Sequence, residues 1–249
     1  MLVSVITSTY NSQAYIADAL ASFCQQNYAQ KELVLVDGGS TDRTLDIVEG
    51  MGLAHQLISE RDSGIYDALN KGVQRAKGDI IGILHSDDVF YDEQVLSAVV
   101  GLFQKNPQLE AVYGDLHYVE RNDLNKLVRN WRSGNFDRKK LAYGWMPPHP
   151  ALFIRKRCFD QYGLYDLQYT SAADYDLILR FLYKYQIETA YLPQVLVKMR
   201  VGGLSNKTFM NRLRANAEDR AAMRSNGVAF PFLMAAWKPL RKIGQYINA

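Results

Sequence analysis

Short apolar segments, rich in β-branched residues, alternate with amphipathic segments along the first 105 residues. The predicted strands cover residues 2–8, 32–36, 55–59 and 79–84. The predicted helices cover residues 15–24, 41–48 and 65–76, the first with Asn11 or Ser12 as its N-cap. Strands that alternate with helices in this way indicate βαβ units. The sequence therefore predicts an α/β fold with an open, mainly parallel sheet flanked by helices.

The second half of the chain has a different order of elements. Its predicted strands cover residues 111–119, 126–131 and 151–154, with two further short strands on either side of Pro193. Its predicted helices cover residues 95–103, 174–185 and 207–224. Since no linker interrupts this order, we expect a single domain over residues 1–205, made of the halves 1–105 and 106–205. A helical extension is expected over residues 206–249.

Composition narrows the class of protein. Of 249 residues, 48% are hydrophobic and 22% charged, which is typical of a soluble globular protein. No apolar run approaches the roughly 20 residues that cross a bilayer, and the N-terminal segment lacks the features of a signal peptide. A cytoplasmic protein is expected.

The net charge of +3 is too small to argue for binding to nucleic acid. Cys24 and Cys158 are expected to be thiols without a disulfide.

Acidic turns follow three consecutive predicted strands. Asp37 follows the second strand, Asp62 the third, and Asp87 and Asp88 the fourth. Because ligands bind outside the carboxyl ends of parallel strands, these side chains are expected to converge on one crevice. Helix capping would account for part of the pattern. It does not account for adjacent carboxylates, which repel each other unless a cation lies between them. Mg²⁺ or Mn²⁺ suits one or two carboxylates completed by phosphate oxygens.

Four motifs occur in a specific order and spacing. They are VSVITSTYN (3–11), LVLVDGGSTDRT (33–44), ERDSGIYDALNKGVQRAKGDIIGILHSDD (60–88) and AADYDL (172–177). Together they resemble the family 2 glycosyltransferases with the GT-A fold, in particular small bacterial members of polysaccharide and O-antigen biosynthesis. The resemblance covers roughly residues 1–205. It implies that residues 1–105 bind a nucleotide-sugar donor and that residues 106–205 bind the acceptor and carry catalysis.

The resemblance also implies roles for residues at the predicted sheet edge. Ser8, Thr9 and Tyr10 match the segment that meets the nucleotide, and Asp37 matches the aspartate that hydrogen-bonds the base, usually uracil. Asp62 lies in the loop that lines the donor site and is expected to touch ligand.

Residues 86–88 stand where the family carries its D-x-D motif, with Ser86 at its first position. The resemblance places Asp87 near the ribose. It makes Asp88 the ligand of a divalent metal, Mn²⁺ or Mg²⁺, that bridges the donor diphosphate.

Transfer of a sugar to a hydroxyl also needs a general base. Asp174 is the candidate, because it matches the second residue of the family's Glu-Asp pair, although Ala173 replaces the Glu. Capping of the helix that follows is the alternative role for Asp174. A single attack assisted by a single base implies that the configuration at the anomeric carbon is inverted, as it is in the family.

Two further positions are candidate contacts. His149 lies in a rigid Pro-Pro-His-Pro segment on the expected acceptor side, where it could touch acceptor or phosphate or simply form a turn. Arg200 precedes Gly202 and Gly203, and this segment could close over the diphosphate as a lid or be a plain turn.

The C-terminal tail and the missing motifs bear on the acceptor. Residues 228–247 combine aromatic and basic side chains, which suits peripheral contact with a membrane and a lipid-linked saccharide acceptor. Packing on the core or on a second subunit of a homo-oligomer is the alternative. The Gln-x-x-Arg-Trp motif of processive members is absent, which favours transfer of one sugar per binding event. A sugar nucleotidyltransferase and a catalytically inactive nucleotide-sugar-binding protein are the competing functions.

Overall fold

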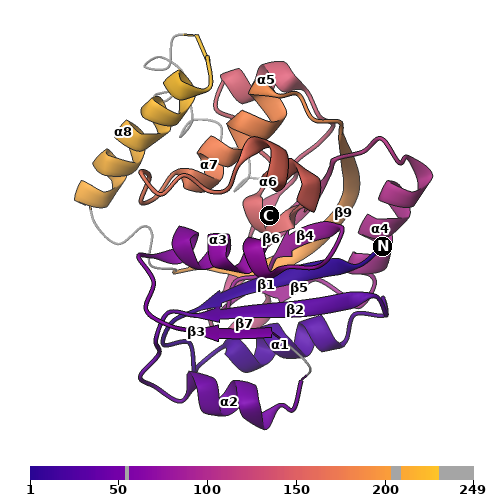
Figure 1. Cartoon of the computed structure of the whole chain (residues 1–249), viewed down its shortest axis with the longest axis vertical. Coiled ribbons are helices and arrows are strands. Elements are labelled where there is room, and N and C mark those ends of the chain that lie inside the picture. Colours follow the sequence, from indigo (N-terminus) through magenta and orange to yellow (C-terminus); the bar gives the residue numbers. More distant parts are fainter. Residues whose placement is uncertain (54–55, 203–208, 230–249) are drawn as a thin grey trace.

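A computed structural model describes residues 1–53, 56–202 and 209–229 of the chain (Figure 1). Its strands are β1 (Val3–Thr9), β2 (Lys31–Asp37), β3 (Gln56–Ser59), β4 (Ile80–Ile83), β5 (Val89–Phe90), β6 (Ala111–Glu120), β7 (Asp123–Trp131), β8 (Leu152–Arg155) and β9 (Thr189–Arg200). Its α-helices are α1 (Ile16–Cys24), α2 (Thr44–Gly50), α3 (Ile65–Arg75), α4 (Val95–Lys105), α5 (Arg138–Ala142), α6 (Lys156–Tyr162), α7 (Ala173–Ile178) and α8 (Phe209–Ser225). A 3₁₀ turn, η1 (His149–Ala151), and a π-helical segment, η2 (Leu179–Lys184), complete the described elements.

The strands form one sheet in the order β3-β2-β1-β4-β8-β6-β9-β5, with β7 paired to β6. β1 is parallel to both β2 and β4, and β2 is parallel to β3, so the predicted parallel sheet of the first half is confirmed. The register pairs Thr9 with Asp37 and Asp37 with Ser59, which aligns the carboxyl ends of three strands. The loops that carry the candidate residues of this half therefore start from one edge of the sheet.

The second half extends this sheet with mixed pairing. β8 is antiparallel to β4 and β6, and β6 is parallel to β9. The two short strands predicted around Pro193 are in fact the single strand β9, which is a correction to the sequence prediction. A proline removes one ladder hydrogen bond and is tolerated where pairing is irregular. The register between β6 and β9 shifts between Tyr113 and Asp115, opposite Pro193, so the proline lies at such an irregularity.

The helix predicted over residues 174–185 divides into α7 and the π-helical segment η2. Single π turns within helices are often found at functional sites, and this one directly follows the turn that carries Asp174. The structure also contains β5, α5 and α6, which the sequence analysis did not predict.

The predicted N-cap of α1 is wrong. Asn11 has a φ of 47° and its Oδ1 accepts a hydrogen bond of 2.9 Å from the amide of Thr41. Ser12 contributes its backbone carbonyl to the amide of Ile16, not its side chain. The N-cap of α2 is Arg43, without a side-chain capping bond, and not Thr41 or Asp42 as the sequence suggested. Asn11 thus joins the loops after β1 and β2.

The sheet separates two hydrophobic cores. Alternation along β1 places Val3 and Val5 in one core and Ile6 in the other. Helices α1 and α4 pack in the core of Val3 and Val5, whereas α3, α6 and α7 pack in the core of Ile6. In Figure 1, α1 and α2 lie below the sheet and α3 lies above it. Among the described residues, no helix is long and apolar enough to cross a membrane.

The predicted helix of the C-terminal extension is confirmed as α8, which lies beside α7 (Figure 1). Ala222, Met223 and Val228 are buried in the core that contains Ile6. The described part of the extension is therefore packed on the domain. Of the tail expected over residues 228–247, residues 230–247 lie outside the described residues.

Gly72 of α3 faces Ile6 of β1 so closely that an added Cβ would collide with the branched Ile6 side chain. We expect Gly72→Ala to lower the free energy of unfolding by about 1–3 kcal/mol, because overpacking a core forces its neighbours out of place. Urea unfolding would measure the change. Gly101→Ala is the matched control, since a Cβ on this helical glycine of α4 meets nothing within 4 Å. It should stabilise the protein by about 0.5–1 kcal/mol. Equal effects of the two substitutions would show that Ile6 can move aside.

Candidate active site

Asp37 anchors the loop that follows β2. Its side chain is buried and accepts hydrogen bonds from the amides of Gly39 and Ser40, at 3.1 and 3.0 Å. The hydroxyls of Ser40 and Ser59 donate to the same carboxylate at 2.5 and 2.9 Å. These bonds use the acceptor capacity of a carboxylate. In this structure Asp37 therefore shapes the loop, and its predicted hydrogen bond to a base stays a prediction.

Asp62 lies against this loop. A Cβ on Gly38 would come within 2.6 Å of Asp62 Oδ2, so the missing side chain of Gly38 makes the space that the carboxylate fills. Asp62 Oδ1 accepts from the amide of Gly64 at 2.9 Å. The turns after β2 and β3 therefore meet, as the sequence predicted, and the partly exposed Asp62 is available to a ligand.

The end of β1 lies next to these turns. Ser8 and Thr9 are buried, and Thr9 Oγ1 has no hydrogen-bond partner within the described part of the chain. Tyr10 is 58% exposed. The three residues that match the nucleotide-binding segment thus pass from the core to the surface at the candidate site.

Asp88 is buried at the end of the loop after β4. Its Oδ1 accepts from the amide of Arg200 at 3.3 Å, and its Oδ2 is buried with no hydrogen-bond partner among the described residues. Burial, followed by the neighbouring charge of Asp87, raises the pKa of Asp88 well above its ordinary value. Asp87 is partly exposed and lies 3.7 Å from Nη1 of Arg121.

The Asp87-Asp88 pair fits a divalent cation. A buried carboxylate oxygen without a donor, next to a second carboxylate, is costly unless a positive charge compensates it. Within the described ranges there is no cluster of three or more His, Cys, Asp or Glu residues that could hold a metal alone. Mg²⁺ and Mn²⁺ in phosphate sites need only one or two carboxylates, because water and phosphate supply the other oxygens. Asp88, with Asp87 beside it, meets that requirement.

Arg200, which the sequence suggested as a contact to the diphosphate, is held inside the protein. Its side chain is buried, and its guanidinium donates to the carbonyls of Asp87 and Arg121, at 2.7 and 3.0 Å, and to Asp18 of α1 at 2.5 Å. In this structure Arg200 holds the Asp87-Asp88 loop against α1, and its contact with a diphosphate stays a prediction. Residues 203–205 of the proposed lid lie outside the described residues.

The sequence analysis did not identify Arg121, which lies at the tip of the β6–β7 hairpin. Its guanidinium covers the ring of Tyr15 at 4.6 Å, and Arg200 covers the same ring at 4.8 Å. Together with the ion pair to Asp87, this stack places a second cation at the candidate diphosphate site. No local motif marks Arg121, because its proximity to Asp87 depends on the fold of the hairpin.

Asp174 is in the first turn of α7 and is partly exposed. Its Oδ1 accepts from the hydroxyl of Tyr66 at 3.1 Å and from the amide of Tyr175 at 2.8 Å. The N-cap of α7 is Ala172, so Asp174 is not the cap, although a carboxylate in the first turn favours the helix dipole. The structure brings Asp174 into contact with α3, which follows the Asp62 turn.

Two histidines lie close together near these aspartates, since His85 is affected by the charges of Asp87 and Asp174. His149 is buried, its Nε2 lies 2.8 Å from the hydroxyl of Tyr165, and its ring is 6.1 Å from that of His85. Burial lowers the pKa of both histidines to about 4, so both are neutral at pH 7. His85 Nδ1 has no hydrogen-bond partner among the described residues. The sequence analysis passed over His85, although its position directly before Ser86 was a usable signal. The predicted contact of His149 with acceptor or phosphate stays a prediction.

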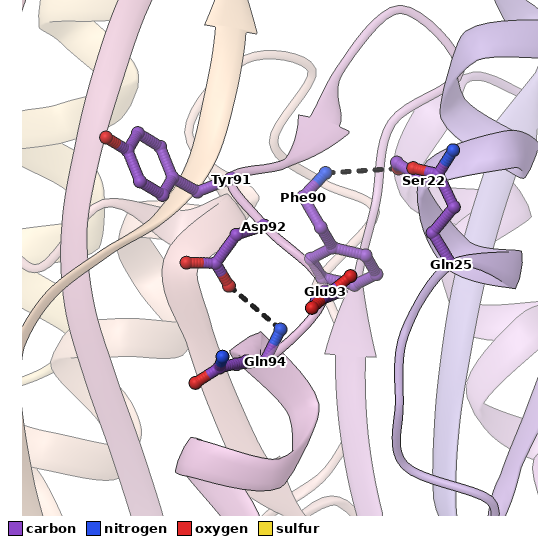
Figure 2. Close-up of a pocket in the computed structure, with 7 residues that line it drawn as sticks. All are labelled: Ser22, Gln25, Phe90, Tyr91, Asp92, Glu93 and Gln94. Atoms are coloured by element: carbon purple, nitrogen blue, oxygen red, sulfur yellow. Dashed lines mark hydrogen bonds between the residues drawn. The ribbon is translucent and has the colours of Figure 1, made fainter.

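A cavity of about 310 Å³ lies beyond β5 and contains none of the predicted site residues (Figure 2). The amide of Phe90 donates to Ser22 Oγ at 3.1 Å, and Asp92 Oδ1 accepts from the amide of Gln94 at 2.9 Å (Figure 2). The first of these bonds fixes the segment after Asp88 to α1. The residues that line this cavity therefore support the candidate site without belonging to it.

Comparison with known proteins adds independent findings. The sequence model described as "Glycosyl transferase family 2" matches residues 4–160. The "PGL/p-HBAD biosynthesis glycosyltransferase" of Mycobacterium bovis is 35% identical over 221 residues, which cover 85% of this chain and 84% of the relative.

Solved structures have the same fold at lower sequence identity. S. aureus TarS 1-349 in complex with UDP-GlcNAc matches with a TM-score of 0.73 and 19% identity, over 100% of this chain and 74% of that one. This chain spans 39% of a longer TarS chain. Mannosyltransferase PcManGT from Pyrobaculum calidifontis, in complex with GDP-Man and Mn²⁺, matches with a TM-score of 0.68 and 19% identity, over 97% and 70% of the two chains.

Proposed function

Because this chain belongs to glycosyltransferase family 2 and has the GT-A fold that the sequence predicted, we propose that it is an inverting, metal-dependent and non-processive enzyme. It moves one sugar per binding event from a nucleoside-diphosphate sugar, in the first instance a UDP-sugar, to a hydroxyl of a glycan or lipid-linked saccharide. Surface polysaccharide biosynthesis is the proposed setting. The observation that carries this proposal is the buried Oδ2 of Asp88, which has no hydrogen-bond partner among the described residues, at the carboxyl edge of the parallel sheet.

The donor site is formed by the ends of β1, β2 and β4. Thr9 Oγ1 and the partly exposed Asp62 are polar groups that a nucleotide can use. The proposal is supported by bound UDP-GlcNAc in TarS and GDP-Man in PcManGT, whose folds match this chain. Since Asp37 is occupied within its own loop, Asp62 is the better candidate for a direct contact with the base.

Asp88, with Asp87 beside it, would hold the metal. When bound, a divalent cation acts as a Lewis acid that stabilises the negative charge of the leaving diphosphate. Arg200 positions both aspartates, because its amide donates to Asp88 Oδ1 and its guanidinium to the carbonyl of Asp87. Arg121 adds a positive charge next to Asp87.

Asp174 is the proposed general base. Its Oδ1 is occupied by Tyr66 and Tyr175, whereas no residue in the described ranges donates to its Oδ2. Oδ2 takes the proton from the acceptor hydroxyl while that oxygen attacks the anomeric carbon and the bond to the diphosphate breaks. Attack on the face opposite the leaving group inverts the configuration at that carbon.

A screen of nucleotide sugars with and without Mn²⁺ tests the proposal. We expect turnover of one donor, measured as released nucleoside diphosphate, and loss of at least about 100-fold in rate on addition of a chelator. Restoration by added Mn²⁺ is the control for the chelator. Undiminished turnover after chelation would contradict metal dependence. Donor binding without turnover would favour an inactive binding protein, and release of pyrophosphate would favour a nucleotidyltransferase.

A further inference from the structure

Tyr66 joins the donor half of the domain to the proposed base. It lies in the first turn of α3, and its hydroxyl donates to Asp174 Oδ1 at 3.1 Å across a sequence separation of 108 residues. Among the described residues, the other donor to Asp174 is the amide of Tyr175, which belongs to α7 itself. The bond from Tyr66 is thus the side-chain contact that fixes the base relative to the donor site.

Tyr66 is itself held firmly. Its ring stacks on Tyr165, with ring centroids 5.8 Å apart and an interplanar angle of 24°. One turn further along α3, Asn70 donates to the carbonyl of Tyr165 and accepts from its amide, both at 2.9 Å. The hydroxyl of Tyr165 lies 2.8 Å from His149 Nε2. This network of contacts between α3 and η1 therefore fixes the Tyr66 ring, whose hydroxyl donates to Asp174.

The Tyr66 hydroxyl acts as a donor at any working pH. Burial, followed by the charge of Asp174 and the hydrogen bond to it, raises the pKa of Tyr66 far above its ordinary value. Among the described residues, Tyr165 is also affected by the charge of Asp174, and burial raises the pKa of Tyr165 as well, so its hydroxyl keeps its proton.

We infer that Tyr66 is a positioning residue for transfer: by holding Oδ1 of Asp174, it orients Oδ2 toward the acceptor hydroxyl. This inference rests on the proposed role of Asp174 as the base. An aspartate carboxylate turns about two side-chain bonds and can sample several orientations, and a second fixed contact restricts them. Because the contact comes from the donor half, it also sets the distance between base and bound sugar.

Tyr66→Phe tests the inference, since phenylalanine keeps the ring on Tyr165 and removes the hydroxyl. We expect kcat at pH 7 to fall about ten-fold, with the KM for the donor within about two-fold of the wild-type value. The loss should fall on kcat and not on donor binding, because the hydroxyl contacts the base and not the nucleotide. A merely structural role would lower stability and change kcat and the donor KM together.

Tyr28→Phe is the matched control, because it removes a hydroxyl bond of 2.6 Å to the carbonyl of Met1, in a residue that belongs to the opposite core. It should leave kcat and the donor KM unchanged. In an Asp174→Asn background, Tyr66→Phe should cause no further loss of rate. Wild-type kcat in Tyr66→Phe, or an additive loss in the double variant, would overturn the inference. Normal turnover of Asp174→Asn alone would instead overturn the base assignment itself.

Discussion

Asp174→Asn is expected to lower kcat for sugar transfer by about a thousand-fold, because positioned general bases contribute on the order of 100- to 10,000-fold. Asparagine keeps the shape of the side chain and can still accept from Tyr66 and Tyr175 through its carbonyl oxygen. It cannot take the proton of the acceptor hydroxyl. Donor binding should persist, since Asp174 belongs to the acceptor half. Calorimetric titration of the donor, next to a transfer assay, measures both quantities.

Asp176→Asn is the control for this prediction because it changes a carboxylate two residues away on the same helix. Asp176 is buried and accepts from Asn226 at 2.8 Å, with Arg180 at 3.7 Å, so it ties α7 to α8. Its substitution should lower stability and leave kcat within a few-fold of wild type, measured below the melting temperature. A normal rate for Asp174→Asn would show that another group takes the proton.

The sequence predicted those parts of the site that depend on local patterns along the chain. Each acidic turn directly follows an apolar strand, so its place at the sheet edge depends only on the strand being parallel to its neighbours. The register that pairs Thr9, Asp37 and Ser59 confirms this for the first half. The same local logic predicted α8 from its own pattern.

The sequence did not predict contacts between residues that are far apart along the chain. Tyr66 meets Asp174 across 108 residues and Arg200 meets the carbonyl of Asp87 across 113, and no local pattern encodes such pairs. Arg200 was a candidate charge of a segment that could close over the diphosphate or form a plain turn, because two glycines follow it closely in the sequence. The fold instead buries its guanidinium between α1 and the loop after β4.

The prediction of two short strands around Pro193 was wrong for a related reason. A proline within an apolar run usually ends a strand, since it lacks the amide that a ladder needs. Here the pairing with β6, which is distant in the sequence, shifts register opposite Pro193, and the strand continues through the proline. A property of the partner strand therefore decides whether the proline interrupts β9.

Asp88→Asn is the second substitution with a large expected effect. It keeps the volume of the side chain and removes the charge that the proposed metal requires, so kcat/KM should fall by about a thousand-fold. Added Mn²⁺ should no longer stimulate the variant. In the wild type, Mn²⁺ with UDP at about 100 times the dissociation constant should raise Tm by about 5–10 °C, and this shift should be lost. Thermal unfolding with and without Mn²⁺ and UDP measures it.

The metal-free Asp88→Asn protein should be at least as stable as the metal-free wild type. A buried carboxylate oxygen without a partner, next to a second carboxylate, destabilises the folded state, and an uncharged amide relieves that repulsion. Asp115→Asn is the matched control, because Asp115 is a buried carboxylate that accepts from Ser133 and Tyr191 at 2.8 and 2.9 Å. It should lower stability and keep the response to Mn²⁺. An Asp88 variant that unfolds more easily but retains a metal-dependent rate would mean that Asp88 supports the fold and that the cation is held elsewhere.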